Sequence, residues 1–223
     1  MDVDDPIAVA VVAAIHAGEA AELERLLTAH EGLAREWLEG RDGTRRSLLH
    51  VATDWPGNRP GVRRTIELLV AHGADVGARF VGPHTETPLH WAASNDDVEA
   101  LDALLDAGAD IEATGAVIAD GTPITDAVAF GQWKAARRLV ERGASVAAHE
   151  AAALGLLDRM VEPYDLDLAF WFAAHGGQRD IAEYLLHRGA DPAWLPDWEP
   201  LDAAGAARRN GFGELADRLS RRS

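Results

Sequence analysis

The amino-acid sequence predicts an all-α fold of stacked helix pairs. The triplet Gly-Ala-Asp, or its variant Gly-Ala-Ser, begins at Gly73, Gly108, Gly143 and Gly189, and the first three copies are 35 residues apart. An apolar pair on one helical face precedes each copy. These pairs are Leu69–Val70, Leu104–Leu105, Leu139–Val140 and Leu185–Leu186. Self-similarity at a fixed period is typical of a solenoid of repeated units rather than of one globular core.

Each predicted repeat contains two short helices joined by a turn. The first helix begins at Thr87-Pro88-Leu89-His90 or at a variant of this motif, namely Thr122–Thr125, Ser47–His50 or Glu199–Asp202. Proline suits the first helical position because its missing N–H would have no partner there, and the preceding hydroxyl caps exposed amides. In the second helix the apolar pair and the residue one turn earlier form a single stripe, and the following glycine ends the helix.

On these motifs the chain resembles the ankyrin-repeat family, whose pattern is met almost fully by residues 87–110. The resemblance implies an all-α ankyrin-repeat solenoid of about six to seven helix–turn–helix units with short hairpin-like loops, in one domain over residues 1–223. The predicted repeats are 5–40, 41–80, 82–115, 117–147, 148–163, 164–196 and 197–223, of which 148–163 is truncated. The stretch AAALGLLDRM, with the repeat after it, is also similar to ankyrin proteins of high-GC soil bacteria.

Four departures from the family pattern are visible. The segment DWPGNRPG (Asp54–Gly61) adds about five residues between two helices, and Asp96 replaces the usual glycine of the interhelix turn. Asparagine and aspartate tolerate the left-handed conformation that such a turn requires. Residues 154–160 predict a truncated helix pair that ends near Pro163. The last repeat, with LDAAGAARRNG, predicts about one extra helical turn.

Composition excludes several classes of function. The net charge is -16, from 37 acidic and 21 basic residues, so the surface repels nucleic acid and anionic lipid and favours a partner with a basic patch. The chain has no cysteine, which excludes disulfides and thiolate chemistry. The apolar stretch Ile7–Ile15 follows three aspartates rather than a positive segment and is too short to span a bilayer. We therefore expect a first helix of the solenoid and a cytoplasmic protein.

No motif for catalysis or for a cofactor emerges. His149-Glu150 lacks the second histidine of H-E-x-x-H, because position 153 is alanine. The resemblance implies that His50 and His90 bond the backbone of the adjoining loop and tie neighbouring repeats together. His84 could pair with His90 on a metal, but no third ligand is placed to help. We predict no enzyme, no metal and no cofactor.

The family binds partners through its hairpin tips and the ends of its first helices. Carrying these positions over predicts partner contacts at Arg46, Asp54, Trp55, His84, Glu86, Ser94, Asn95, Ile118, Ala129, Phe130, Tyr164, Asp165, His175, Arg209 and Asn210. Trp55 and Phe130 are aromatic anchors if they are exposed, and packing residues if the inserted loop and a neighbouring helix cover them. Trp133, by its register, is expected in the core.

The sequence therefore predicts a non-catalytic protein–protein interaction module that binds a partner protein on its concave face, as a scaffold or as a regulator of a partner enzyme. We expect a monomer. Two alternatives stay open at this point: a hydrolase with a His/Asp site on the same face, and a protein that associates with itself through exposed aromatic side chains.

Overall fold

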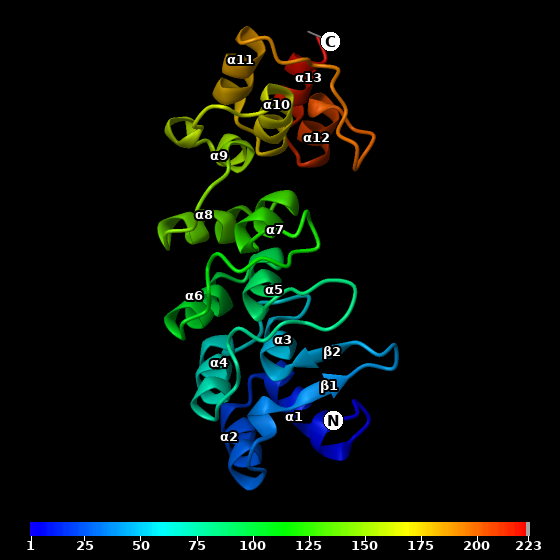
Figure 1. Cartoon of the computed structure of the whole chain (residues 1–223), viewed down its shortest axis with the longest axis vertical. Coiled ribbons are helices and arrows are strands. Elements are labelled where there is room, and N and C mark those ends of the chain that lie inside the picture. Colours follow the sequence, from blue (N-terminus) through cyan, green and yellow to red (C-terminus); the bar gives the residue numbers. More distant parts are fainter. Residues whose placement is uncertain (222–223) are drawn as a thin grey trace. The chain divides into compact units, whose positions relative to one another are not determined.

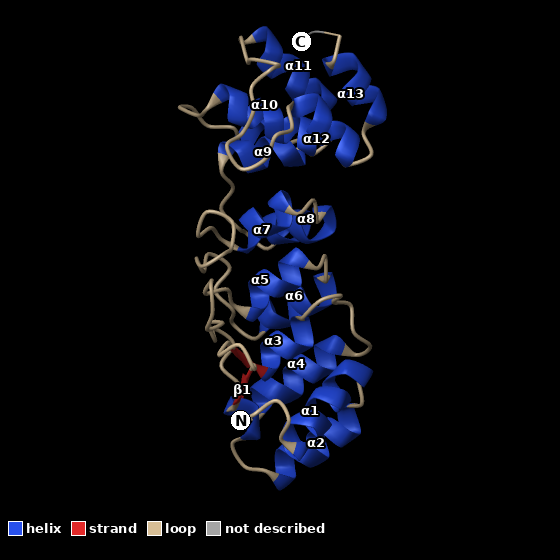
Figure 2. Cartoon of the chain, turned by 90° about the vertical axis from the view of Figure 1, so that its right-hand side faces the viewer, coloured by secondary structure: helices blue, strands red, loops and turns tan. Residues whose placement is uncertain are grey.

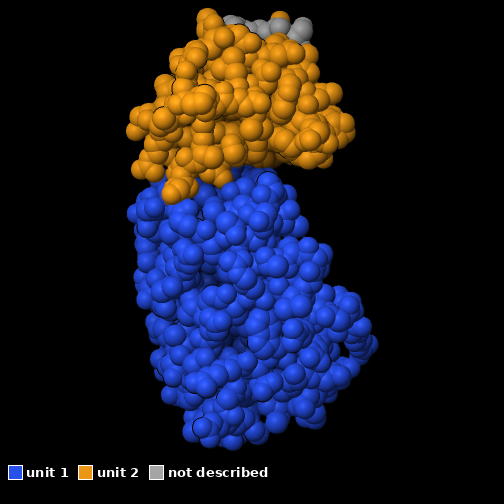
Figure 3. Space-filling model, viewed as in Figure 1, with its two compact units in different colours: residues 1–144 blue, residues 145–223 orange. Residues whose placement is uncertain are grey.

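A computed structural model of the chain describes residues 1–221 and confirms the all-α repeat fold. The chain divides into two compact units, unit 1 (residues 1–144) and unit 2 (residues 145–223), shown in Figure 3. Helix pairs dominate both units (Figure 1). The one-domain prediction over residues 1–223 stays a prediction, as do the exact repeat boundaries.

Unit 1 contains four helix pairs and one short β-hairpin. The pairs are α1 (Pro6–Ala17) with α2 (Ala20–Ala29), α3 (Leu48–Thr53) with α4 (Val62–Ala71), α5 (Pro88–Ser94) with α6 (Val98–Asp106), and α7 (Pro123–Ala129) with α8 (Trp133–Glu141). The 3-10 turn η1 (Leu33–Arg35) and the antiparallel strands β1 (Trp37–Glu39) and β2 (Arg45–Ser47) join the first two pairs. Each helix pair lies inside one predicted repeat.

The helices of unit 1 pack in two rows. First helices contact first helices, from α1 through α3 and α5 to α7, and second helices contact second helices, from α2 through α4 and α6 to α8. The loops that join successive repeats run along one side of these helices (Figure 2). Because the repeats stack in register, loop residues that are far apart in the sequence become neighbours on that side.

Buried histidines join successive repeats, as predicted. His50 and His90 are fully buried, and each exchanges hydrogen bonds with the N-cap residue of its own helix, Ser47 or Thr87. The opposite ring nitrogen Nε2 lies 3.1 Å from the carbonyl oxygen of Glu86 for His50, and 3.4 Å from that of Gly121 for His90. Since a carbonyl oxygen only accepts, Nε2 carries the proton, and since Nδ1 accepts from the backbone N–H of Ser47 or Thr87, both rings are neutral. Burial lowers the pKa of His50 to about 4.

The interhelix turn of the third repeat also joins its neighbours. Asp96 has a φ of 54°, the left-handed conformation predicted for this position, and its Oδ1 accepts from the backbone N–H of Ala135 at 2.8 Å. Asp97 caps α6 with Oδ1 and accepts from the backbone N–H of Asn58 with Oδ2 at 2.6 Å. The inserted loop 54–61 is thereby fixed to the following repeat.

The predicted apolar stripes form the core of unit 1. Ile66, Leu69, Leu101 and Leu104 are fully buried, while the second residue of each apolar pair is half-buried. The prediction that Trp133 lies in the core is wrong: it is only half-buried, because it is the first residue of α8 and sits at the edge of the turn.

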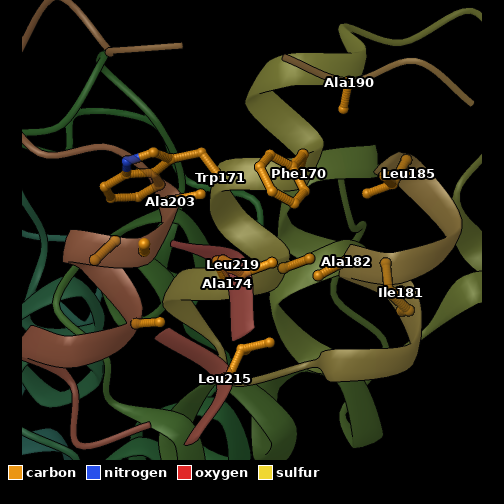
Figure 4. Close-up of a cluster of buried hydrophobic side chains, with 14 of the residues drawn as sticks. Phe170, Trp171, Ala174, Ile181, Ala182, Leu185, Ala190, Ala203, Leu215 and Leu219 are labelled. Carbon is orange, nitrogen blue, oxygen red and sulfur yellow. The ribbon is translucent and has the colours of Figure 1, made fainter. Parts of the chain in front are cut away.

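Unit 2 has an irregular first repeat. It contains α9 (Ala148–Leu154), the 3-10 turn η2 (Leu157–Arg159), α10 (Leu166–His175), α11 (Arg179–His187), α12 (Ala203–Arg209) and α13 (Gly213–Leu219). The 3-10 turn follows α9 in place of a second α-helix. This repeat is therefore the truncated helix pair that the sequence predicts. The core of unit 2 gathers Phe170, Trp171, Leu185 and their neighbours from α10, α11, α12 and α13 (Figure 4).

The last repeat corrects two predictions. Asp202 is the N-cap of α12, since its carboxylate accepts from the backbone N–H of Gly205 at 2.7 Å, so the helix begins three residues later than the motif at Glu199 predicts. The extra helical turn is also absent, because α12 has seven residues, as α5 has. Residues 222 and 223 of the last predicted repeat lie outside the described residues.

Candidate functional site

One open hollow on unit 1 collects residues from three successive repeats. We call it the aromatic hollow; it has a volume of about 210 Å³ and is open to solvent. Its lining comes from the loop after α3, the segment before α5, α5 itself, the loop between α6 and α7, and the end of α7. The lining residues are Asp54, Trp55, His84, Glu86, Trp91, Ser94, Asn95, Val117 and Phe130. Seven of these nine were predicted as partner contacts from the sequence, all but Trp91 and Val117.

Exposed apolar side chains are concentrated at this hollow. Trp55 is 78% exposed, Val117 54% and Phe130 47%, and Trp91 beside them is half-buried. The other large exposed apolar residues described in unit 1 are Val9, Val81 and Ile118. A cluster of apolar side chains left in water is typical of an interaction site.

The inserted loop holds Trp55 at the rim. The backbone N–H of Trp55 donates to Oδ1 of Asp54 at 2.9 Å, and Arg59 donates from its guanidinium to the carbonyl oxygens of both residues at 3.4 Å. Asn58 is bonded to the next repeat through its backbone N–H and through its side chain, which donates to the carbonyl oxygen of Asn95. The loop is therefore anchored close to the indole ring.

Glu86 is a nearly buried carboxylate of the hollow, only 6% exposed. Its Oε2 accepts from the indole N–H of Trp91 at 2.8 Å, and its Oε1 accepts from the backbone N–H of Val117 at 3.0 Å. His84 Nδ1 lies 3.1 Å from Oε2, although without the geometry of a hydrogen bond. Glu86 thereby fixes the orientation of two residues of the hollow that sequence reasoning missed.

A second carboxyl group lies against Glu86. Asp126 of α7 is fully buried, and neither of its oxygens has a hydrogen-bond partner of ordinary geometry. Burial, followed by the adjacent charge of Glu86, raises the pKa of Asp126 to about 8. Asp126 is therefore the protonated member of the pair at neutral pH. Asp126 was not predicted from the sequence, although its register in the repeat is that of Trp91.

A larger hollow adjoins the aromatic hollow. It has a volume of about 570 Å³ and shares His84 and Trp91 with it. The rest of its lining consists of Val3, Gly40, Arg41, Asp42, Thr44, Arg46, Phe80 and Pro83. Phe80 stacks on His84 at 4.6 Å between ring centroids and lies 5.5 Å from Trp91. An aromatic wall therefore separates the two hollows.

Several predicted contact residues also have internal roles. Arg46 forms an ion pair with Asp54 at 2.6 Å, which neutralises that carboxylate. Ser94 donates from its hydroxyl to the carbonyl oxygen of His90, and Asn95 donates from its side chain to that of Thr53, both at 2.9 Å. Ala129 is half-buried and, like Ile118, lies outside the hollow.

The predicted residues of unit 2 do not line either hollow. His175 is buried; its Nδ1 lies 2.8 Å from the side-chain nitrogen of Asn210 and 3.2 Å from the guanidinium of Arg209, and Trp171 stacks on its ring. Asp165 caps α10 by accepting from the backbone N–H of Leu168. The hydroxyl of Tyr164 lies 3.5 Å from the guanidinium of Arg188. In unit 2 these side chains make contacts within the unit, and their role as partner contacts stays a prediction.

The geometry does not favour a hydrolase. His84 approaches Glu86, but the hollow around them is open and would not exclude water from a reaction. Within residues 1–221 no three His, Asp or Glu side chains are grouped so that they could hold a metal ion. Over the same residues no helix has the length and apolar character to cross a membrane.

The comparisons with known proteins agree on one family. A model described as ankyrin repeats in three copies matches residues 59–150, and a single ankyrin repeat matches residues 166–197, together more than half of the chain. A Caenorhabditis elegans relative, ankyrin repeat and KH domain-containing protein mask-1, is 29% identical over 155 residues, which is 70% of this chain but 5% of that protein. The human ASB11 ankyrin repeat domain is similar in structure, with a TM-score of 0.56 and 18% identity over 94% of this chain and 96% of that one. This likeness concerns the fold alone.

Proposed function

The chain belongs to the ankyrin-repeat family, and from that premise we propose that it is a non-catalytic interaction module that binds a partner protein at the aromatic hollow of unit 1. Ankyrin repeats are generally protein–protein interaction modules, and fold by itself does not identify the partner. The hollow lies on the side of the hairpin loops and first helices, where the sequence predicts the concave binding face. A scaffold and a regulator of a partner enzyme both fit this proposal.

The gathering of Trp55, Val117 and Phe130 at one hollow is the observation that carries the proposal. These side chains come from the second and fourth repeats, so no single local sequence accounts for their meeting. Burying one exposed aromatic side chain of this kind in an interface is often worth about 2 kcal/mol or more. A partner that covers the hollow would remove all three side chains from water.

Affinity capture with matched variants tests the proposal. We would immobilise the wild-type chain, the double variant Trp55→Ala, Phe130→Ala and the control double variant Val9→Ala, Trp198→Ala, and identify retained proteins from an extract of the source organism by mass spectrometry. Val9 and Trp198 are 55% and 54% exposed and lie outside the hollow. We expect one protein to be retained by the wild type and the control and lost by the hollow variant. Equal retention by all three would reject the hollow as the binding site.

Self-association is the alternative that exposed aromatic side chains also favour. Light scattering of the wild type at high concentration separates the two, because a monomer throughout the range rejects self-association. The monomeric state, the cytoplasmic location, the bacterial origin and the basic patch on the partner stay predictions from the sequence.

A further inference from the structure

The negative charge of Glu86 has no strong cation beside it. Glu86 is 6% exposed, and its one ion-pair neighbour among the described residues is His84 rather than an arginine or a lysine. Buried charges in proteins are normally paired. The other carboxylate of the aromatic hollow differs, because Asp54 is already paired with Arg46. The uncompensated charge of the hollow is therefore located at Glu86.

Asp126 does not compensate the charge of Glu86. It is fully buried against Glu86 and has no arginine or lysine of its own. The two carboxyl groups together hold one negative charge at neutral pH, in surroundings with little water to screen it. Low-dielectric walls focus such a field toward the opening of the hollow.

The walls of the hollow suit a flat cation. Trp55, Trp91 and Phe130 present aromatic rings, and rings attract cations through their negative faces. A guanidinium group is planar, stacks on aromatic faces and is only weakly hydrated, whereas the ammonium of lysine is a compact and strongly hydrated charge. Each oxygen of Glu86 accepts one hydrogen bond from the protein and retains capacity for a second.

We propose that the aromatic hollow binds the guanidinium group of an arginine side chain of the partner protein, paired with Glu86 and stacked against the aromatic rings. This inference rests on the proposed function, since it names the partner group that the same site recognises. The net charge of -16 attracts a basic segment to the chain over a longer range, and the arginine then fixes its position.

Nuclear magnetic resonance with a single-residue probe tests the inference without a known partner. The probe is Nα-acetyl-arginine amide, and its control is the citrulline analogue, which has nearly the same shape and no charge. The reporter is the indole N–H signal of Trp91, because that N–H donates to Glu86. We expect a saturable shift of this signal with the arginine probe, with a Kd on the order of 1–10 mM, and none with citrulline.

Matched variants locate the charge that is responsible. Glu86→Gln removes the charge and should weaken probe binding at least tenfold. Asp120→Asn makes the same change of charge on an exposed loop outside the hollow and should leave binding unchanged. Trp55→Ala, Phe130→Ala keeps both carboxyl groups, so a loss of binding there shows the aromatic contribution even if Glu86→Gln perturbs the fold.

Three results would overturn the inference: no shift with the arginine probe, an equal shift with citrulline, or tighter binding of the lysine analogue. Its failure is distinguishable from that of the proposed function. One outcome is a captured partner that depends on Trp55 and Phe130 and yet binds the Glu86→Gln variant with wild-type affinity. This result would contradict the arginine inference and still support the hollow as the binding site. A partner that the Trp55→Ala, Phe130→Ala variant retains as well as the wild type does would show that the hollow is not the binding site.

Discussion

Glu86, in the segment before α5, and Asp126, on α7, bring two carboxyl groups together inside unit 1, and only one of them is ionised at neutral pH. Stacking of consecutive repeats produces this contact. Asp126 occupies the position where the preceding repeat carries Trp91, so a carboxyl group replaces an indole ring on a buried face. The pair is therefore expected to dominate the response of unit 1 to pH above neutrality.

The titration of Asp126 gives the first prediction. The native chain keeps the proton of Asp126 up to a pH of about 8, whereas the unfolded chain loses it near the ordinary value for aspartate, about 4. The native state thus binds more protons across this range, and stability falls as the pH rises through it and levels off above pH 8. Below about pH 6.5 the neutral histidines act in the opposite direction, because the unfolded chain protonates them first. The range from pH 7 to pH 8.5 isolates Asp126.

Urea unfolding at these two pH values tests the prediction. We expect the wild type to lose about 1 kcal/mol between pH 7 and pH 8.5 and the Asp126→Asn variant to lose much less. Carbon-13 spectra of the side-chain carboxyl group measure the same pKa directly. Titration of Asp126 near pH 4 would contradict the contact with ionised Glu86.

Replacement of the buried histidines should weaken the coupling between repeats. His50→Ala leaves the carbonyl oxygen of Glu86 and the cap at Ser47 without their partner and creates a cavity, and we expect a loss of about 2–4 kcal/mol in the free energy of unfolding. His90→Ala should cost less, because its bond to Gly121 is longer, at 3.4 Å against 3.1 Å. Urea titrations of the two variants rank the losses. A reversed order would show that packing rather than hydrogen bonding decides the effect.

Two substitutions at Asp96 test the combined contribution of its left-handed backbone conformation and its hydrogen bond to Ala135. Asp96→Asn tolerates the positive φ and keeps the oxygen that accepts from Ala135, so its stability should stay within about 0.5 kcal/mol of the wild type. Asp96→Ala loses that acceptor and places an ordinary Cβ residue at a φ of 54°, which should cost about 1–3 kcal/mol. Thermal unfolding of both variants and of the wild type measures these differences in stability. Equal stability of the alanine and asparagine variants would refute both causes.

Gly176 offers a substitution whose nearest neighbours lie within unit 2. A Cβ at this position would lie 1.9 Å from the carbonyl oxygen of Ala153, because α9 packs closely on the end of α10. Gly176→Ala should therefore destabilise unit 2 by about 1–3 kcal/mol or more through overpacking. Hydrogen exchange followed by residue would show faster exchange in residues 145–221 and unchanged protection in α5 and α7. Uniform loss of protection over both units would show that they unfold together.

Most of the fold follows from local chemistry in the sequence. The caps at Ser47 and Thr87, the left-handed glycines after the second helices and the apolar stripe through Leu104 each specify a short element on their own. The sequence prediction for the start of the last repeat is wrong because Glu199-Pro200 resembles the cap motif, while the carboxylate that caps α12 belongs to Asp202. Both Glu199 and Asp202 carry a carboxylate that can cap a helix, and only the hydrogen bond from the backbone N–H of Gly205 to Asp202 separates them.

The sequence predicts which residues lie at the candidate site, but not how these residues interact there. Register places Trp55, Glu86 and Phe130 among the predicted partner contacts, because repeats present equivalent residues on one face, and all three line the hollow. Register could not show that Glu86 is nearly buried, since that depends on Val117 closing over it from the following loop. The pKa of Asp126 depends on the same non-local contact and has no signature within its own helix.

The inserted loop 54–61 affects how a partner can associate. An ordinary eight-residue surface loop is mobile, and a partner that used it would lose free energy to order it at each encounter. Here Asn58 is bonded to Asp97 and Asn95 of the next repeat, and Arg59 bonds the carbonyl oxygens of Asp54 and Trp55, so the free chain already holds the loop in place. In the proposed interface the insertion is therefore a preorganised contact, in which the side chain at position 55 can be exchanged while the entropic cost of association stays nearly the same.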